Sequence, residues 1–263
     1  MSSAPQNWDP GHYLKFQDLR LRPALDLLAR VPLADIQRFT DLGCGAGTVT
    51  PYLCKLWQNA WAIGLDSSAE MLHRADACNP GLNVHWQQGD IADWSAPQPQ
   101  DLIFSNAVLH WLDGHQNLFP QLMRQLAPGG VLAVQMPNQF AEPSHTLMRE
   151  AAFDGPWAEV LKPLLREAPV ARMGDYYDWL SPMAASVEIW ETTYAQILDG
   201  EDAVLDWIGS TALKPLLEAL DQSLRDEFKA VLAAKLRKAY PQRQDGSTLF
   251  PFRRMFMVAV VPA

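Results

Sequence analysis

Cysteine is scarce in this chain, and the three that are present, Cys44, Cys54 and Cys78, form no C-x-x-C pair. No group of histidines and cysteines has the spacing of metal ligands, so we expect no metal site. Sparse, unpaired cysteines are typical of reduced thiols in a cytoplasm. The first residues show neither a basic start nor an apolar run, which favours a cytoplasmic protein without a signal peptide. The longest apolar stretch, around residues 255–261, is too short to span a membrane.

Positive charge is also in deficit, because 21 basic residues face 30 acidic ones and the net charge is −9. An acidic chain without a basic cluster repels nucleic acid and anionic membranes, so we expect neither as a partner. Small anions can still bind where a few cations gather. The 263 residues, 48% of them hydrophobic, are enough for one large domain or for a core with an added cap. Chain length and composition do not define an oligomeric state.

One stretch, residues 40–48 (Thr-Asp-Leu-Gly-Cys-Gly-Ala-Gly-Thr), predicts the end of a buried strand, a glycine-rich turn and the start of a helix. Gly43, Gly45 and Gly47 let the backbone turn sharply and approach a ligand closely. Their spacing differs from the dinucleotide fingerprint G-x-G-x-x-G, and no Lys-Ser/Thr pair follows as in a phosphate-binding loop. Asp41 beside the turn favours a ligand with positive charge. S-adenosylmethionine (SAM), which carries an ammonium and a sulfonium, fits this requirement.

Strands and helices alternate from residue 37 onward. The pattern predicts strands at residues 38–42, 60–65, 83–87, 101–105 and 131–135, with helices between them that include residues 48–57 and 117–126. Such alternation is typical of a doubly wound, parallel α/β sheet. Further strands are predicted at residues 187–194 and 252–261. The other segments predict helices, at residues 13–21, 23–30, 144–153, 158–167 and, in three pieces broken near Pro215 and Asp221, 201–240.

These elements suggest three parts. Residues 1–35 would form a helical segment that covers the site. Residues 36–137, 187–195 and 250–263 would form the α/β core, and residues 138–186 and 196–249 would form a helical lid with substrate insertions.

Polar residues follow four of the predicted strands, where ligands of α/β sheets bind. Asp66 can accept hydrogen bonds from both ribose hydroxyls of a nucleoside, or it can simply cap a helix. Asp90 and Ile91 would flank an adenine, unless they form a plain turn. Asn106 offers its carbonyl oxygen to an ammonium, or it only ends a strand. Together with the glycine turn these residues converge on one sheet edge, which favours the binding interpretation.

His110 and Trp111 come just after Asn106, where the reactive methyl group of SAM should project. A histidine there can act as a general base, bind a substrate oxygen or cap a helix. We favour contact with the substrate.

Several cations and tyrosines could bind an anionic substrate. Arginine pairs bidentately with carboxylates, although most arginines are solvated surface residues. Tyrosines in the same segments can donate hydrogen bonds or can serve ordinary packing. The candidates are Arg20, Arg22, Arg149, Arg253, Arg254, Tyr13, Tyr176 and Tyr177.

With these residues in place, the chain resembles the class I SAM-dependent methyltransferases. The matching motifs lie at residues 41–47, 64–68, 90–91, 101–106 and 126–130. More narrowly, segments beyond these general motifs resemble the bacterial trans-aconitate methyltransferases. These segments are residues 8–10, 13–16, 22–30, 142–150, 176–178, 189–194, 205–207 and 252–256.

The resemblance implies a mostly parallel, seven-stranded Rossmann-like sheet with an antiparallel last strand and a helical lid. It implies SAM as cofactor, S-adenosylhomocysteine as its product, and no metal. Ser67 and Met71 then join the cofactor-binding residues Asp41, Gly43, Gly45, Gly47, Asp66, Asp90, Ile91 and Asn106. A small anionic tricarboxylate would be bound by Tyr13, Arg22, His110, Arg149, Tyr176, Tyr177 and Arg254.

The implied reaction is direct, in-line methyl transfer to one carboxylate of trans-aconitate, which yields a monomethyl ester. A carboxylate with a pKa near ~4 is already ionised at neutral pH, so no general base is required. His110 and Trp111 are therefore candidates for positioning. Three alternatives stay open: a methyltransferase acting on another small or carrier-bound acid, a dehydrogenase, and a non-catalytic SAM-binding protein.

Overall fold

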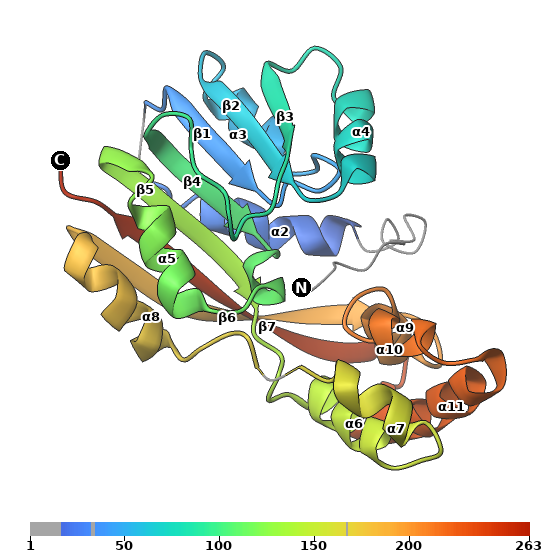
Figure 1. The fold of residues 1–263 in the computed structure, drawn as a ribbon. Helices are drawn as coiled ribbons and strands as arrows, with labels where there is room; N and C mark the ends of the chain where they lie inside the picture. Colours follow the sequence, from blue (N-terminus) through green and yellow to red (C-terminus); the bar gives the residue numbers. More distant parts are fainter. Residues whose placement is uncertain (1–16, 33–34, 167) are drawn as a thin grey trace. The chain divides into compact units, whose positions relative to one another are not determined.

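The computed structural model describes residues 17–32, 35–166 and 168–263. Seven strands form one sheet in the order β3-β2-β1-β4-β5-β7-β6 (Figure 1). Strands β1 to β5 pair with one another in parallel, and β7 runs antiparallel to β5. The strand bounds are Arg38–Leu42 (β1), Trp61–Asp66 (β2), Val84–Gln88 (β3), Gln100–Asn106 (β4), Leu126–Pro137 (β5), Ser186–Leu198 (β6) and Thr248–Val260 (β7). The predicted mostly parallel, seven-stranded sheet is confirmed.

The chain folds into two compact units. The α/β unit consists of residues 20–137, 169–192 and 254–263; among the described residues, the helical unit consists of 17–19, 138–166, 168 and 193–253. The α/β unit contains α3 (Thr50–Leu56), α4 (Ala69–Cys78), η1 (Leu109–Trp111), α5 (His115–Met123), α8 (Met173–Leu180) and η3 (Ser181–Met183). The helical unit contains α6 (Pro143–Phe153), α7 (Ala158–Leu161), η2 (Lys162–Leu164), α9 (Ala203–Gly209), α10 (Lys214–Glu218) and α11 (Gln222–Ala239). Helix α2 (Gln17–Leu28) and strands β6 and β7 contribute residues to both units.

Each unit has its own apolar core. In the α/β unit the central strands are buried on both faces, as a parallel sheet with helical cover requires, and Phe104 and Phe119 are fully buried there. In the helical unit Trp157 packs edge-on against Phe228, and the Trp157 indole N–H donates to Ala151 O over 2.7 Å. Within the described residues no helix is long and apolar enough to cross a membrane.

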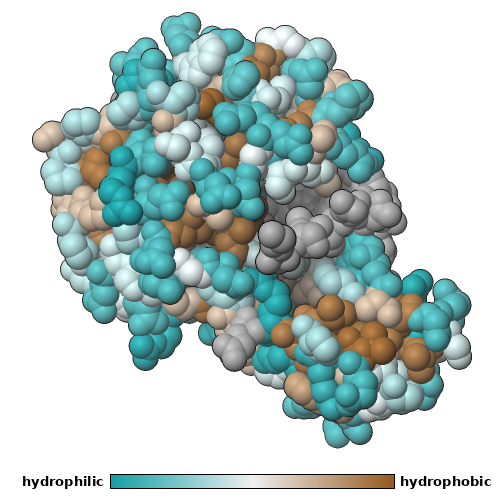
Figure 2. Space-filling view, viewed as in Figure 1, coloured by the Kyte–Doolittle hydropathy of each residue, from teal (hydrophilic) through white to brown (hydrophobic). Residues whose placement is uncertain are grey.

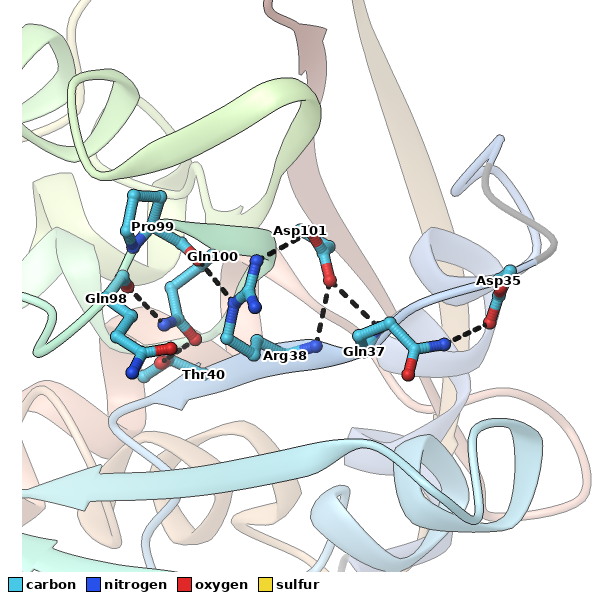
Figure 3. A network of polar contacts seen from close by, with 8 residues as sticks. All are labelled: Asp35, Gln37, Arg38, Thr40, Gln98, Pro99, Gln100 and Asp101. Carbon is cyan, nitrogen blue, oxygen red and sulfur yellow. Dashed lines mark hydrogen bonds and ion pairs between the residues drawn. The ribbon is translucent and has the colours of Figure 1, made fainter.

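A polar network joins β1 and β4 at their amino ends (Figure 3). Asp101 Oδ2 accepts hydrogen bonds of 2.9 Å from the backbone N–H groups of Gln37 and Arg38. Deeper in the sheet, the buried Thr40 hydroxyl donates to Gln100 Oε1 over 3.0 Å. These bonds fix the pairing of the two strands whose other ends carry the candidate site.

Some predicted helix bounds are wrong. Residues 17–28 form one helix with Pro23 inside it, where two helices were predicted; residues 13–16 lie outside the described part. The predicted helix 117–126 stops at Met123, because β5 already begins at Leu126 and contains Pro128. The predicted helix 158–167 changes to a 3-10 turn at Lys162–Leu164, where Pro163 has no N–H to continue an α-helix. Helix α8 was not predicted.

Candidate functional site

The carboxyl ends of four parallel strands bring the predicted cofactor residues to one edge of the sheet. Leu42 pairs with Leu65 on one side and with Ser105 on the other. Asp66 and Asn106 are the last residues of β2 and β4, and Asp90 follows the end of β3. Because β1 lies between β2 and β4, the helical connections diverge on its two sides, which is where doubly wound sheets bind ligands.

The three glycines of the turn after β1 all have positive φ, of 71°, 55° and 70° for Gly43, Gly45 and Gly47. A Cβ atom on Gly43 would lie 2.4 Å from Val108 Cγ2, whereas one on Gly45 would meet nothing within 4 Å. Packing therefore requires glycine at position 43. At position 45 the backbone borders open space that a ligand can approach closely.

Asp66 ties the glycine turn to the next helix. Its Oδ2 accepts from Gly45 N and its Oδ1 from Ser68 N, both over 2.9 Å. Each carboxylate oxygen keeps a further lone pair, so Asp66 can also accept from ligand hydroxyls. The Ser68 hydroxyl caps α4 by accepting from Met71 N, while Ser67 is exposed.

Asp41 is a buried carboxyl group beside the turn, with only 2% of its surface exposed. Burial raises its pKa to about 7; the hydrogen bond from Thr50 Oγ1, 2.7 Å long, offsets part of the rise, and the charge of Asp66 adds to it. A buried carboxylate is stabilised by a nearby cation, so this position suits a positively charged ligand group.

Asn106 places an acceptor next to a strained backbone. Its Oδ1 is buried, and no described residue donates a hydrogen bond to it. Ala107, the next residue, has φ of 57°, in the left-handed region that non-glycine residues seldom adopt, and its N–H donates to Gln135 O over 2.8 Å. Buried acceptors are nearly always satisfied, so Asn106 Oδ1 is available to an N–H donor of a ligand.

The other cofactor candidates differ in exposure. Ile91 is buried and can form an apolar wall, and Met71 is half-buried. Asp90 is exposed, and its Oδ1 already accepts from Ala92 N over 2.9 Å.

Several candidates for substrate contact belong to the same edge. His110 and Trp111 form the 3-10 turn just beyond β4, with ring centroids 4.9 Å apart. Arg254 is 3% exposed and donates from Nη1 to Gln135 Oε1 over 3.2 Å. Gln135 is in register with Asn106, so the guanidinium of Arg254 is linked through one side chain to the end of β4.

The remaining substrate candidates differ in exposure and in the unit that contains them. Tyr176 is fully buried, Tyr177 is 53% exposed, and Arg22 is exposed, with its Nε 3.9 Å from Asp26 Oδ2. Arg149 lies in the helical unit and donates from Nη2 to Phe140 O over 2.6 Å. Tyr13 lies outside the described residues.

Sequence reasoning assigned no role to Thr50 or Ala107. Thr50 could have been noticed as a hydroxyl at the start of the helix after the glycine turn. Ala107 carries no sequence signal, because alanine does not normally mark a left-handed position.

A doubly wound sheet with an acidic, glycine-rich turn after β1 and a carboxylate at the end of β2 defines the class I methyltransferases. The methyltransferase domain family matches residues 39–130. The chain is 49% identical over 253 residues to the trans-aconitate 2-methyltransferase of Azoarcus sp. (strain BH72), covering 96% of this chain and 98% of that protein. It is 46% identical to the protein of the same name from Methylobacterium nodulans, again over 96% and 98% of the two chains. This chain belongs to the trans-aconitate 2-methyltransferase family.

Solved structures share the fold at lower identity. The phosphoethanolamine N-methyltransferase 2 of Haemonchus contortus, solved with S-adenosyl-L-methionine, is 18% identical with a TM-score of 0.56, and the match covers 92% of this chain and 53% of that one. The YcgJ protein of Bacillus subtilis is 16% identical with a TM-score of 0.57, over 91% and 97% of the two chains. Among the described residues no group of three or more His, Cys, Asp or Glu side chains could hold a metal ion.

Proposed function

We propose that this chain transfers the methyl group of SAM to one carboxylate of trans-aconitate, giving the monomethyl ester and S-adenosylhomocysteine. The observation that carries the proposal is the 49% identity to an enzyme of that name across 96% of the chain. That match extends far beyond residues 39–130, so it includes the helical unit as well as the cofactor-binding turn. The three cysteines are free thiols, which supports a cytoplasmic location.

The residues at the sheet edge fit SAM. Asp41 and the unsatisfied Asn106 Oδ1 would accept hydrogen bonds from the ammonium group of SAM. The open space at Gly45 would let the ligand approach the backbone closely. Asp66 would accept from the ribose hydroxyls, with Ile91 as an apolar wall for the adenine. When bound, SAM supplies an electrophilic methyl group on a sulfonium.

The acceptor requires positioning more than activation. A carboxylate with an ordinary pKa of ~4 is ionised at neutral pH, so His110 need not remove a proton. Correct orientation of two reactants can contribute roughly 7–11 kcal/mol. His110 and Arg254 would bind the carboxylates that do not react, with Arg22 and Tyr177 as further contacts. The attacking carboxylate would be held less tightly, because fully paired oxygens are poorer nucleophiles.

Product analysis tests the activity. The purified protein is incubated with SAM and a panel of acids that contains trans-aconitate, other di- and tricarboxylates and a carrier-bound acyl acid, and the products are identified by mass spectrometry. We expect a monomethyl ester of trans-aconitate as the main product. Preference for another acid would move the assignment to a different acceptor. Binding of SAM without any ester would favour a non-catalytic SAM-binding protein.

Substitution of the buried cation tests the pocket. Loss of a charge-assisted hydrogen bond costs about 1.5–3 kcal/mol, so Arg254→Gln should raise the KM for trans-aconitate roughly 10- to 150-fold. The Kd for SAM should change little, since Arg254 is not among the SAM contacts. Arg124→Gln, which removes an exposed arginine after α5, is the matched control. If Arg254→Gln does not raise the KM above that of Arg124→Gln, the assigned pocket is wrong.

A further inference from the structure

A buried hydrogen-bond chain supports the turn that carries His110 and Trp111. The first residue of α5, His115, is 3% exposed, and its Nε2 lies 2.9 Å from Leu109 O. Its Nδ1 lies 2.6 Å from the hydroxyl oxygen of Tyr176 in α8. The N–H of Ala171 donates to that same hydroxyl over 3.3 Å. The chain therefore runs from the start of α8 through α5 to the turn, entirely inside the α/β unit.

The acceptors define where the protons lie. Leu109 O can only accept, so His115 Nε2 must carry a hydrogen. With that hydrogen on Nε2, Nδ1 can accept from the Tyr176 hydroxyl, whose oxygen accepts from Ala171 N–H. Burial raises the pKa of Tyr176 above its usual range, so the hydroxyl keeps its proton. Each polar atom in the chain has a partner of the right kind.

The two side chains are also confined by their neighbours. Phe119 lies with its ring centroid 5.3 Å from that of His115 and 4.8 Å from that of Tyr176. Tyr176 is fully buried, and α5 and α8 lie side by side (Figure 1). Neither ring can rotate without displacing packed atoms, so the position of Leu109 O is tied to the packing of α5 against α8.

We propose that His115 and Tyr176 are positioning residues for the acceptor: their hydrogen bonds hold the Leu109–Trp111 turn where His110 and Trp111 meet the acceptor's carboxylates. The inference rests on the proposed function, which supplies the acceptor. It replaces direct substrate contact as the role of Tyr176, whose hydroxyl is committed to His115 and Ala171. Small displacements matter in such a site, since a misplacement of about 1 Å can cost on the order of 100-fold in rate.

The first variant is Tyr176→Phe, which keeps the ring and removes only the hydroxyl. His115 Nδ1 then loses its donor, so the imidazole that binds Leu109 O is held less firmly. We expect kcat/KM for trans-aconitate to fall at least tenfold, while the Kd for SAM stays within about twofold of the wild-type value, because Asp41 and Asp66 are untouched.

The matched control is Thr40→Val, which also removes one buried hydroxyl from the α/β unit. Its hydrogen bond, to Gln100, belongs to the network at the amino ends of β1 and β4 (Figure 3). This variant should lose comparable stability and keep wild-type kinetics at a temperature well below unfolding. If the two variants lose kcat/KM equally, the effect is one of stability and the proposal is wrong.

A second pair separates the hydrogen bond from the shape of the ring. His115→Gln can still donate to Leu109 O, whereas His115→Leu cannot. We expect the glutamine variant to retain several-fold more kcat/KM than the leucine variant. Equal kinetics in the two variants at equal stability would overturn the role of the hydrogen bond.

Hydrogen exchange tests the same idea without turnover. In the wild type Trp111 N–H donates to Val108 O and Leu112 N–H to Leu109 O, both over 2.9 Å. These two amides should exchange faster in Tyr176→Phe and at the wild-type rate in Thr40→Val. Unchanged exchange in Tyr176→Phe refutes the proposal. If instead the turn loosens as expected but the wild type methylates no acid, the proposed function fails and the structural role of the pair stands.

Discussion

Replacement of Asp41 by asparagine should stabilise the SAM-free protein and weaken the binding of SAM. The substitution keeps the shape of the side chain, and its carbonyl oxygen can still accept from Thr50 Oγ1. What changes is the buried charge. Asp41 is 2% exposed, and burial raises its pKa from 3.8 to about 7.

The stability effect follows from proton linkage. Between pH 4 and pH 7 the unfolded chain has released the Asp41 proton and the folded chain still holds it, so the free energy of unfolding falls as pH rises through this window. Above pH 7 the loss levels off. A rise of about three pKa units, at ~1.4 kcal/mol each, corresponds to about 4 kcal/mol at pH 8. The asparagine variant does not incur this loss.

The assay is denaturant unfolding of both proteins without SAM. We expect the stability advantage of Asp41→Asn to be about 2–3 kcal/mol larger at pH 8 than at pH 5, since only part of the loss has developed at the lower pH. Comparing the two proteins at each pH cancels the contribution of other titrating groups to the pH dependence of stability. One such group is His145, whose burial lowers its pKa to about 4. Asp76→Asn, an exposed residue of α4, controls for the change of carboxylate to amide.

Binding should change in the opposite direction. If Asp41 binds the ammonium of SAM as proposed, the variant loses a charge-assisted contact, and its Kd, measured by calorimetry at pH 8, should rise at least about tenfold. An advantage that does not grow with pH would refute the burial argument. Unchanged affinity for SAM would show that Asp41 does not face the ammonium group.

Two further predictions concern the backbone around the site. Gly43→Ala should cost about 2 kcal/mol or more of stability beyond Gly45→Ala, because the added Cβ would meet Val108, and thermal unfolding measures the difference. Gly45→Ala should instead chiefly weaken SAM binding. If Gly43→Ala and Gly45→Ala lose the same stability, the packing role assigned to Gly43 is wrong. Ala107 has φ of 57°, so Ala107→Gly should be at least as stable as the wild type. Ala107→Val should lower the free energy of unfolding by about 1 kcal/mol or more, which thermal unfolding measures. A valine variant as stable as the wild type would mean that the left-handed conformation is not needed.

Local patterns were enough to predict the sheet and the residues that meet at the carboxyl ends of its strands. The alternation of strands and helices and the polar residues after four strands depend on neighbouring residues alone. Parallel strands then necessarily bring Asp66 and Asn106 to the edge that carries the glycine turn. Helix bounds around Pro23, Pro128 and Pro163 were predicted less well, because tertiary packing and strand pairing outweigh local propensity there.

Local patterns could not predict which of the aromatic and basic residues are buried and which are exposed. By sequence, Tyr176 and Tyr177 are equivalent tyrosines, and only the packing of α8 against α5 buries one and exposes the other. The same holds for Arg254, whose burial beside Gln135 depends on the antiparallel pairing of β5 with β7, more than a hundred residues apart in the chain.

The class of fold, the glycine-rich turn after β1 and the family thus follow from the sequence alone, since each depends on short motifs or on similarity along the chain. The tertiary structure decided which carboxylate is buried, which acceptor is left for a ligand and which tyrosine supports the turn at His110. Burial, charge and hydrogen-bond partners depend on residues that come together only when the chain folds, and local sequence does not record them.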